Sequence, residues 1–346
     1  MRRALLSGFL GLVLAACGGA PAAGGSASAG PSTGGKPERD HVVAMTGTTS
    51  GSSAAMWIAG EEGLFQKHGL NVDVRYAEST VTTAALVSGE AQFAQGDGPS
   101  ALAANVSGVP MKIVAVLNKH NSYSIVTRPD IKTPAALKGK VIAIAKSGDT
   151  SDISAHIALK PYGLQVGTDV GELSVGNSAP RLAALLSGQV AGAVLSEAFV
   201  DQAVANGMHV LISLEQAQIP YMATAVEVID SFAKANPNTV IAYLEGLIEG
   251  ERFFSDPANK PESMAILAKY LKAKPTDPAV EGNYTFYHDR LVHDITPEKA
   301  GADTALDALK AIDPARYANV SSDVIIDGSF MEEITKSGFQ KKVWGE

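Results

Sequence analysis

Apolar and polar positions follow a pattern that predicts alternating strands and helices over the first two thirds of the chain. Short runs rich in valine, isoleucine and alanine are separated by segments with helical periodicity. The predicted strands are residues 42–46, 72–76, 92–95, 111–117, 123–127, 141–145, 171–175, 191–195, 210–212 and 221–228. The predicted helices are residues 53–68, 82–87, 100–106, 134–139, 151–162, 179–186 and 197–206, and the chain after residue 230 is mostly helical. This order predicts an α/β fold with largely parallel sheets.

The pattern also contains an internal repeat with an offset of 99 positions. A strand that runs into a hydroxyl-rich glycine loop at residues 42–50 recurs at 141–149. The helix end and strand at residues 84–94 recur at 183–193. Two similar units facing each other form a cleft, and clefts between lobes bind ligands.

The repeat predicts two lobes joined by a two-strand hinge, with crossings near residues 124–131 and 220–226. Lobe 1 is expected to comprise residues 38–127 and 225–346, and lobe 2 residues 128–224. Each lobe is expected to hold a mixed, mostly parallel sheet flanked by helices.

The N-terminal segment has the features of a secretory signal. Two arginines precede an apolar run that is too short to span a bilayer as a mature helix. Small residues then lead to Cys17, in a pattern that resembles the bacterial lipobox. The resemblance implies removal of residues 1–16 and lipidation of Cys17; an ordinary signal peptide with an incidental cysteine is the alternative. Residues 17–37 are rich in Gly, Ala, Ser and Pro, which predicts a flexible tether.

Charge and cysteine content narrow the possible functions. The net charge is −8, and becomes −10 without Arg2 and Arg3. Nucleic acid is not an expected partner, because phosphate binding needs clustered lysine and arginine. Cys17 is the single cysteine, so no internal disulfide can form. After the N-terminal segment, no run of apolar residues is long enough to predict a transmembrane helix.

Hydroxyl-rich loops at the starts of helices are the first candidate ligand-binding positions. Helix N-termini at the carboxyl edge of an α/β sheet present free N–H groups, which suit carboxylate, sulfonate or phosphate groups. Ordinary N-capping is the alternative for each loop. The candidates are Thr48, Thr49, Ser50, Gly98, Ser100, Ser147, Thr150 and Ser151.

Four further side chains are placed near the predicted cleft. Asp97 and Glu197 follow the third strand of each lobe, where they could meet a ligand amine or ring nitrogen, or cap the next helix. Arg181 could pair with an anionic ligand, but a solvated position on the helix surface is expected. Tyr221, at the return crossing, could stack on a ligand. The late aromatic run at residues 284–288 is expected to pack in the core.

Several motifs, in order, resemble one family of transport proteins. The segments at residues 56–74, 86–116 and 137–143 are similar to the sulfonate, taurine, nitrate and thiamine-pyrimidine binding proteins of ABC importers. The resemblance covers about residues 42–255. It implies the type II periplasmic-binding-protein fold, and a monomer that delivers a small molecule to a permease with an ATPase partner. It also implies a pocket-wall side chain at Trp57, for which a core aromatic is the alternative.

Motifs for catalysis are missing from the sequence. The seven histidines show no metal-site spacing, and no nucleophile elbow, P-loop or dinucleotide fingerprint occurs. A His/Cys-rich motif of a fungal pyrimidine-synthesising relative has no match either. We therefore expect no catalytic residue, metal or cofactor.

The expected function is capture of a small organic ligand, a sulfonate, a carboxylate or a pyrimidine-like molecule, for an ABC importer. The protein is expected in the cell envelope, lipid-anchored to the outer face of the plasma membrane or, in a Gram-negative cell, on the periplasmic side or at the outer membrane. A sensory lipoprotein without transport, or an enzyme on the same fold, are the alternatives. Hydroxyl-rich loops favour an anionic ligand, whereas Asp97 and Glu197 favour a cationic or heteroaromatic one, so the ligand stays open.

Overall fold

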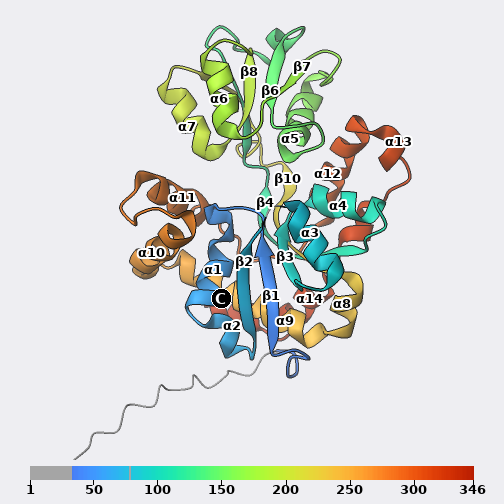
Figure 1. Cartoon of the computed structure of the whole chain (residues 1–346), viewed down its shortest axis with the longest axis vertical. Coiled ribbons are helices and arrows are strands. Elements are labelled where there is room, and N and C mark those ends of the chain that lie inside the picture. Colours follow the sequence, from blue (N-terminus) through green and yellow to red (C-terminus); the bar gives the residue numbers. More distant parts are fainter. Residues whose placement is uncertain (1–32, 78) are drawn as a thin grey trace, which may run out of the picture.

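A computed structural model describes residues 33–77 and 79–346 and folds them into two lobes, one above the other (Figure 1). The signal peptide, Cys17 and most of the expected tether lie outside the described residues. Each lobe contains one five-stranded sheet. Across residues 33–77 and 79–346, no helix has both the length and the apolar character to cross a membrane.

The sheet of lobe 1 has the strand order β2-β1-β3-β10-β4. β1, β2 and β3 are parallel, whereas β10 runs antiparallel between β3 and β4. The strands are β1 (His41–Thr46), β2 (Asn71–Tyr76), β3 (Phe93–Gly96), β4 (Met111–His120) and β10 (Pro220–Ile229). The antiparallel strand returns from lobe 2, so the chain enters and leaves lobe 1 at neighbouring positions.

The sheet of lobe 2 repeats this arrangement in the order β7-β6-β8-β5-β9. β6 is parallel to β7 and β8, and β5 is antiparallel to β8 and β9. The strands are β5 (Tyr123–Thr127), β6 (Val141–Ile144), β7 (Gly171–Ser174), β8 (Gly192–Ser196) and β9 (His209–Ser213). The repeat in the sequence thus corresponds to two sheets with one topology.

The two crossings lie slightly earlier in the chain than expected. β5 pairs only with strands of lobe 2, so the first crossing is between His120 and Tyr123 and precedes the expected boundary at residue 127. β10 pairs with β4 from Pro220 onward, so the return crossing ends before residue 224. The difference arises because β5 and β10 each begin to pair with strands of the new lobe immediately after the hinge. Apolar runs in the sequence do not reveal with which strands they pair.

The helices of the first half cover the sheets and begin near the carboxyl ends of strands. The predicted helix at residues 53–68 is divided at Gly63, whose φ of 66° ends α1. These helices are the 3₁₀ turn η1 (Gly51–Ser53), α1 (Ala54–Glu61), α2 (Leu64–Lys67), α3 (Ser79–Ser88), α4 (Gly98–Val106), η2 (Pro134–Leu137), α5 (Thr150–Leu159), η3 (Lys160–Tyr162), α6 (Ser178–Leu186) and α7 (Glu197–Ala205).

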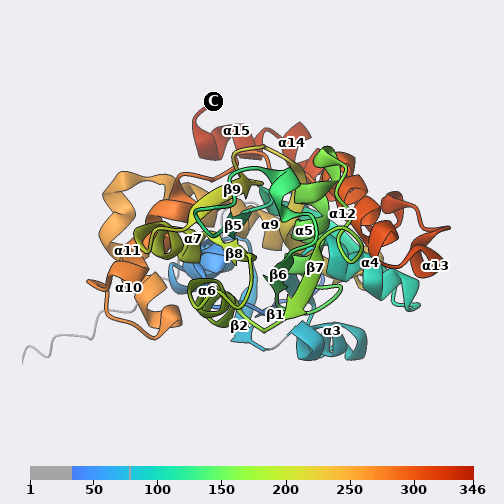
Figure 2. The ribbon, with the colours of Figure 1, turned by 90° about the horizontal axis from the view of Figure 1, so that it is seen from above.

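The helices after β10 pack on lobe 1. Seen from above, α10 and α11 lie on one side of the hinge, and α12 and α13 on the other (Figure 2). They are α8 (Asp230–Ala235), α9 (Pro237–Ser255), η4 (Pro257–Asn259), α10 (Lys260–Leu271), α11 (Pro278–His288), α12 (Lys299–Ile312), α13 (Pro314–Tyr317), η5 (Ser322–Ile325), α14 (Ser329–Lys336) and α15 (Phe339–Trp344). α9 is buried along much of its length against α1.

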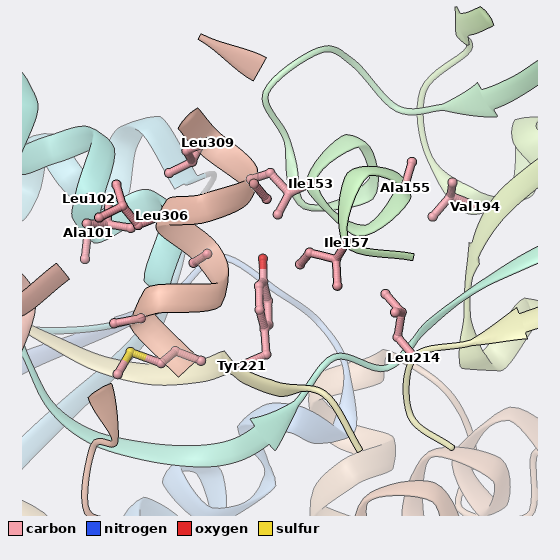
Figure 3. Packing of buried hydrophobic residues seen from close by; sticks show 14 of the residues in the cluster. Ala101, Leu102, Ile153, Ala155, Ile157, Val194, Leu214, Tyr221, Leu306 and Leu309 are labelled. Carbon is pink, nitrogen blue, oxygen red and sulfur yellow. The ribbon is translucent and has the colours of Figure 1, made fainter. Parts of the chain in front are cut away.

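One apolar contact joins the two lobes beside the hinge. Ile153 and Ile157 of α5 share one buried apolar cluster with Leu306 and Leu309 of α12. Tyr221 lies between the two helices, and Leu306 lies beside Ala101 and Leu102 of α4 (Figure 3). These side chains are at least nine-tenths buried. Full burial of one such aliphatic side chain contributes about 1.5–3 kcal/mol, so this contact stabilises the closed arrangement of the lobes.

The first described residues already contact lobe 1. The Thr33 amide donates to Glu245 Oε1 at 2.7 Å, and the Gly35 amide to Asn238 Oδ1 at 2.8 Å. Glu38 accepts from the Asn238 and Thr239 amides and so caps α9. Residues 33–37, the end of the expected tether, therefore lie against the folded domain.

Candidate functional site

The candidate site lies between the lobes, where the carboxyl ends of the parallel strands of both sheets meet. Thr150, the first residue of α5 in lobe 2, donates its hydroxyl to Asp97 Oδ2 of lobe 1 at 2.9 Å. Asn121 Nδ2, at the first crossing, donates to Ser154 Oγ at 3.0 Å. These polar contacts and the α5–α12 contact hold the cleft closed.

Asp97 also caps α4 on the lobe 1 side. Its Oδ1 accepts from the Ser100 amide at 2.8 Å, and Ser100 Oγ lies 3.1 Å from the Asp97 amide, which completes a capping box. Gly98 is the buried first residue of this helix. Ser100 Oγ further donates to Glu227 Oε1 at 2.7 Å. Burial raises the pKa of Glu227 to about 8.

The hydroxyl-rich loop of lobe 1 forms a chain of hydrogen bonds. Thr48 Oγ1 donates to Ser50 Oγ at 3.1 Å, and Ser50 Oγ lies 2.7 Å from Ser52 Oγ. The Tyr287 hydroxyl of α11 is 3.5 Å from Ser50 Oγ. Thr49 is exposed. The loop therefore holds several hydroxyls linked to one another, with Tyr287 beside them.

Gly51 allows α11 to close over this loop. A Cβ at Gly51 would lie 2.5 Å from Tyr287 Cδ2, a distance that side-chain atoms do not tolerate. The Gly51 amide donates to Asn283 Oδ1 at 2.9 Å. Tyr287 is therefore held against the loop and is only partly buried, whereas its neighbour Tyr284 packs in the core as expected.

A small cavity of about 20 Å³ lies under the loop, with room for about one water molecule. Glu251 of α9 faces it and is buried, and its Oε2 has no hydrogen-bond partner. Burial raises the pKa of Glu251 to about 8. The cavity is lined by Gly51, Ser52, Ala54, Ala55, Leu117, Asn118, Thr224, Glu251, Phe254, Tyr287, Arg290 and Leu291.

In lobe 2, Arg181 is buried, whereas the sequence predicted a solvated position on the helix surface. Only 2% of Arg181 is exposed, and its Nη2 donates to Ser178 Oγ at 2.7 Å. Its Nε and Nη1 have no hydrogen-bond partner of normal geometry, although the Tyr123 hydroxyl and the Asp149 carboxylate both interact with its charge. The expectation failed because α6 turns this residue inward, against the ring of Tyr123, which lies 5.8 Å from Arg181 Cζ.

Tyr123 and Ser196, which pair across β5 and β8, lie beside Arg181. Tyr123 is the first residue of β5 after the hinge crossing. Burial raises the pKa of its phenol, and the positive charge of the nearby Arg181 partly offsets this increase. Ser196, the repeat partner of Asp97, lies 3.0 Å from Ser178 through the two hydroxyl oxygens. Asp149 contributes a negative field to both Tyr123 and Arg181 without forming an ion pair with Arg181.

The loop before α5 is held mainly by its own hydrogen bonds. Asp149 Oδ1 accepts from the Ser151 and Asp152 amides at 3.1 Å and caps the helix. Ser151 is buried, and its hydroxyl donates to Asp149 Oδ1 at 2.7 Å. Ser147 is exposed. Of the predicted residues in this loop, Thr150 is the one that contacts the opposite lobe.

Trp57 and Tyr221 lie in apolar surroundings. Trp57 is 1% exposed in the lobe 1 core and stacks on Tyr270 with 4.6 Å between ring centroids. This position favours the core role over the pocket wall. Tyr221 lies in the interlobe contact of Figure 3, and its hydroxyl has no hydrogen-bond partner. Burial raises the pKa of this phenol well above its usual value.

Glu197 begins α7 at the end of β8 and is partly buried. Its Oε2 has no hydrogen-bond partner. Burial raises the pKa of the Glu197 carboxyl, and the positive charge of Arg290 partly offsets this increase. Arg290 itself donates from Nε to Glu215 Oε1 at 3.1 Å. The two acidic residues that the repeat pointed to thus differ: Asp97 is engaged in hydrogen bonds, and Glu197 keeps a free oxygen.

Sequence patterns missed some of these polar groups, because their positions depend on how distant elements pack. Tyr287 and Glu251 come from the helices after β10, far from the repeat. A further group, Asp152, His156 and Glu172, brings three possible metal-ligand atoms within 4.8 Å of one another. The spacing of four between Asp152 and His156 was the one signal available for that group.

Comparisons with known proteins agree with this architecture. A Brucella abortus protein described as a candidate binding protein is 28% identical over 232 residues. The match covers 62% of this chain, and the chain spans 66% of the length of that relative.

Two solved structures share the two-lobed arrangement. SsuA from Methylobacillus flagellatus, described as a periplasmic sulfonate-binding protein, aligns with a TM-score of 0.71 at 18% identity, over 88% of this chain and 96% of that chain. The periplasmic nitrate-binding protein NrtA from Synechocystis aligns with a TM-score of 0.65 at 18% identity, over 87% and 89% of the two chains. At these identities the likeness establishes the periplasmic-binding-protein fold, as the sequence predicted.

The sequence itself establishes the family. The model of the NMT1/THI5-like family matches residues 51–259, more than half of the chain. These residues include both crossings and all of lobe 2, and they begin at Gly51, within the hydroxyl-rich loop of lobe 1. The protein belongs to the NMT1/THI5-like family.

Proposed function

We propose that this protein is the solute-binding component of an ABC importer and captures a small organic anion between its lobes. The buried guanidinium of Arg181 is the observation that carries the proposal. A charge held away from water costs several kcal/mol unless it is paired and hydrogen-bonded. Arg181 donates to Ser178 and lies beside the Tyr123 phenol and the field of Asp149, but two of its nitrogen atoms have no hydrogen-bond partner of normal geometry.

An anionic ligand would supply the missing partner. Carboxylates and sulfonates accept two parallel hydrogen bonds from a guanidinium, and charge-assisted hydrogen bonds are about twice as strong as neutral ones. Arg181 lies behind Tyr123, next to the hinge and close to the start of α5. This position near the hinge supports a ligand that contacts both lobes.

The groups that face the cleft favour a ligand with one anionic end. Asp97 already accepts hydrogen bonds from Ser100 and Thr150, so it is not available as the main partner of a cation. The hydroxyls of Ser50 and Tyr287 can bond a second polar group of the ligand. These features support a sulfonate or a carboxylate over a pyrimidine-like ligand.

Ligand binding would stabilise the closed form, because the ligand contacts both lobes only when they are together. A micromolar dissociation constant requires about −8 kcal/mol. Bidentate pairing with Arg181, hydroxyl hydrogen bonds and partial burial of the ligand are sufficient for this affinity.

The assignment to transport also rests on the family and on the named functions of its structural neighbours, which bind sulfonate or nitrate. The protein would bind its ligand without changing it, and pass it to a permease that an ATPase drives. It would act as a monomer in the cell envelope, anchored through lipid on Cys17.

A ligand screen tests this proposal directly. The purified protein is heated with alkanesulfonates, taurine, aromatic carboxylates, nitrate and thiamine pyrimidine precursors. We expect an increase in Tm with at least one organic anion, and calorimetry should give a 1:1 complex. Stabilisation by a neutral pyrimidine alone would contradict the anion assignment, and no stabilisation by any compound would contradict solute capture.

The same complex distinguishes binding from catalysis. After long incubation, the bound ligand is released by denaturation and identified by mass spectrometry. We expect the ligand to be recovered unchanged and in full. A product that accumulates with time would favour an enzyme on this fold.

A further inference from the structure

A second polar cluster lies in lobe 2, on the side of α5 that faces β7. Asp152 and His156 are one helical turn apart on α5, and Glu172 is on β7. One ligand atom from each of these residues lies within 4.8 Å of the other two. The cluster plays no part in the interlobe contacts described above.

Two oxygen atoms of this cluster have no hydrogen-bond partner. Asp152 is 1% exposed, its Oδ2 accepts from the Gly148 amide at 2.6 Å, and its Oδ1 is unpartnered. Glu172 Oε1 is also buried without a partner. A buried carboxylate oxygen of this kind loses its hydration without a full hydrogen bond in return, and the imidazole of His156 is the group beside it that can carry a positive charge.

His156 approaches Asp152 but does not satisfy it. His156 Nε2 lies 3.3 Å from Asp152 Oδ1, which is ion-pair distance when the imidazole is protonated, but the geometry is not that of a hydrogen bond. Two ligand atoms about 2.1 Å from one tetrahedral metal ion lie about 3.4 Å apart. The separation is therefore the one that adjacent ligands of a metal have.

We propose that Asp152, His156 and Glu172 bind a divalent transition-metal ion such as zinc. One imidazole and two carboxylates are a ligand set that zinc and similar ions accept, with a water molecule at an open position. Two carboxylates also neutralise a divalent ion. The Gly148 amide holds the other oxygen of Asp152, as outer hydrogen bonds hold metal ligands in place.

The position of the ion gives it a structural role. Thr150, two residues before Asp152, makes the hydrogen bond to Asp97 of lobe 1. A metal ion bound to Asp152 would fix the first turn of α5, and with it the loop from Gly148. The ion would thus order one wall of the cleft without contacting the ligand.

Metal binding is tested on the full chain without any organic ligand. The protein is treated with chelator, dialysed, and titrated with zinc in competition with a chromophoric chelator. Cobalt provides a second readout through its visible absorption. We expect one ion per chain, and at least about tenfold weaker binding in Glu172→Gln and in His156→Gln.

The variants separate metal binding from folding. Glu172→Gln keeps the side-chain shape and removes one of two buried carboxylates, so we expect the metal-free variant to melt no lower than the metal-free native protein. His209→Gln, in the same lobe, should bind zinc like the native protein. The absence of zinc binding would overturn the proposal. Binding that both cluster variants retain unchanged would also overturn it, and would identify zinc bound at the surface only.

Discussion

The Thr150 hydroxyl donates a 2.9 Å hydrogen bond to Asp97 Oδ2 and so joins the first turn of α5 in lobe 2 to the cap of α4 in lobe 1. Each residue lies at the start of a helix that follows a parallel strand of its sheet, although Ser196, and not Thr150, is the repeat partner of Asp97. The same carboxylate accepts from the Ser100 amide. Closure of the lobes and capping of α4 therefore depend on one side chain.

Thr150→Val tests this contact, because it keeps the shape of the side chain and removes the hydroxyl donor. A hydrogen bond to a charged group contributes about 1.5–3 kcal/mol. We expect the ratio of closed to open molecules to fall about tenfold or more, which small-angle scattering can follow as a larger radius of gyration. Thr168→Val, at an exposed position of lobe 2, is the control. An unchanged radius in Thr150→Val would show that the hydrogen bond does not control closure.

Arg181→Met is expected to maintain or raise the stability of the free protein and to lower its affinity for the anion. The free protein loses an unpaired buried charge, and apolar replacement of such groups is often neutral or stabilising. Its Tm should therefore stay or rise. The affinity for the anion found in the screen should fall at least about tenfold, measured by calorimetry.

Arg128→Gln provides the matched control for Arg181. Arg128 is in the same lobe, but it is partly exposed and pairs with Asp130. We expect Arg128→Gln to leave both the Tm and the affinity for the anion close to those of the native protein. If Arg181→Met kept its affinity for every anion, the guanidinium would not be the anion site.

His68 is expected to make stability depend on pH in the alkaline range. Burial by itself would lower the pKa of His68, but Glu245 and Glu249 outweigh it and raise the pKa to about 9. Because the folded pKa lies above the unfolded value of about 6.5, the stabilisation is fully present below pH 6.5. It is lost as pH rises through about 9, and amounts to at most about 3 kcal/mol.

Urea unfolding of the native protein and His68→Gln checks this dependence. We expect the native protein to be the more stable one at pH 6, and the difference to shrink by pH 9.5. His41→Gln, an exposed histidine on β1, should follow the native curve. A difference that is constant from pH 6 to pH 9.5 would contradict a charged His68.

Two helical glycines test the packing of lobe 1. A Cβ at Gly250 of α9 would lie 2.4 Å from the Ala55 carbonyl oxygen of α1, whereas a Cβ at Gly282 of α11 would meet nothing within 4 Å. We expect Gly250→Ala to lower the free energy of unfolding by about 2 kcal/mol or more. Gly282→Ala should raise it by about 0.5–1 kcal/mol. Equal effects in calorimetry would contradict the close α1–α9 contact.

Most of the fold could be predicted because its signals are local. Apolar runs marked the strands, and the repeat between residues 42–94 and 141–193 indicated two similar lobes. The exact crossings were displaced, since β5 and β10 are assigned to a lobe by their neighbours in the sheets. Helix division at Gly63 was also missed, because a single glycine within a helical pattern does not reveal its φ.

The candidate site was predictable only in part. Asp97 and Thr150 follow strands of the repeat, and the structure brings them together. Arg181 was expected on the surface, because its inward direction depends on the packing of α6 against Tyr123. Tyr287 and Glu251 reach the cavity from helices that the repeat does not include.

By itself, the sequence determined the α/β class, the two related lobes and the hydroxyl-rich loops at their facing edges. These features depend on periodicity and on residues that are neighbours in the chain. Only the tertiary structure decided which buried side chains keep polar atoms without hydrogen-bond partners, among them Arg181 and Asp152 in lobe 2. The physical reason is that hydrogen-bond satisfaction depends on atoms from distant segments, whose approach no local pattern encodes.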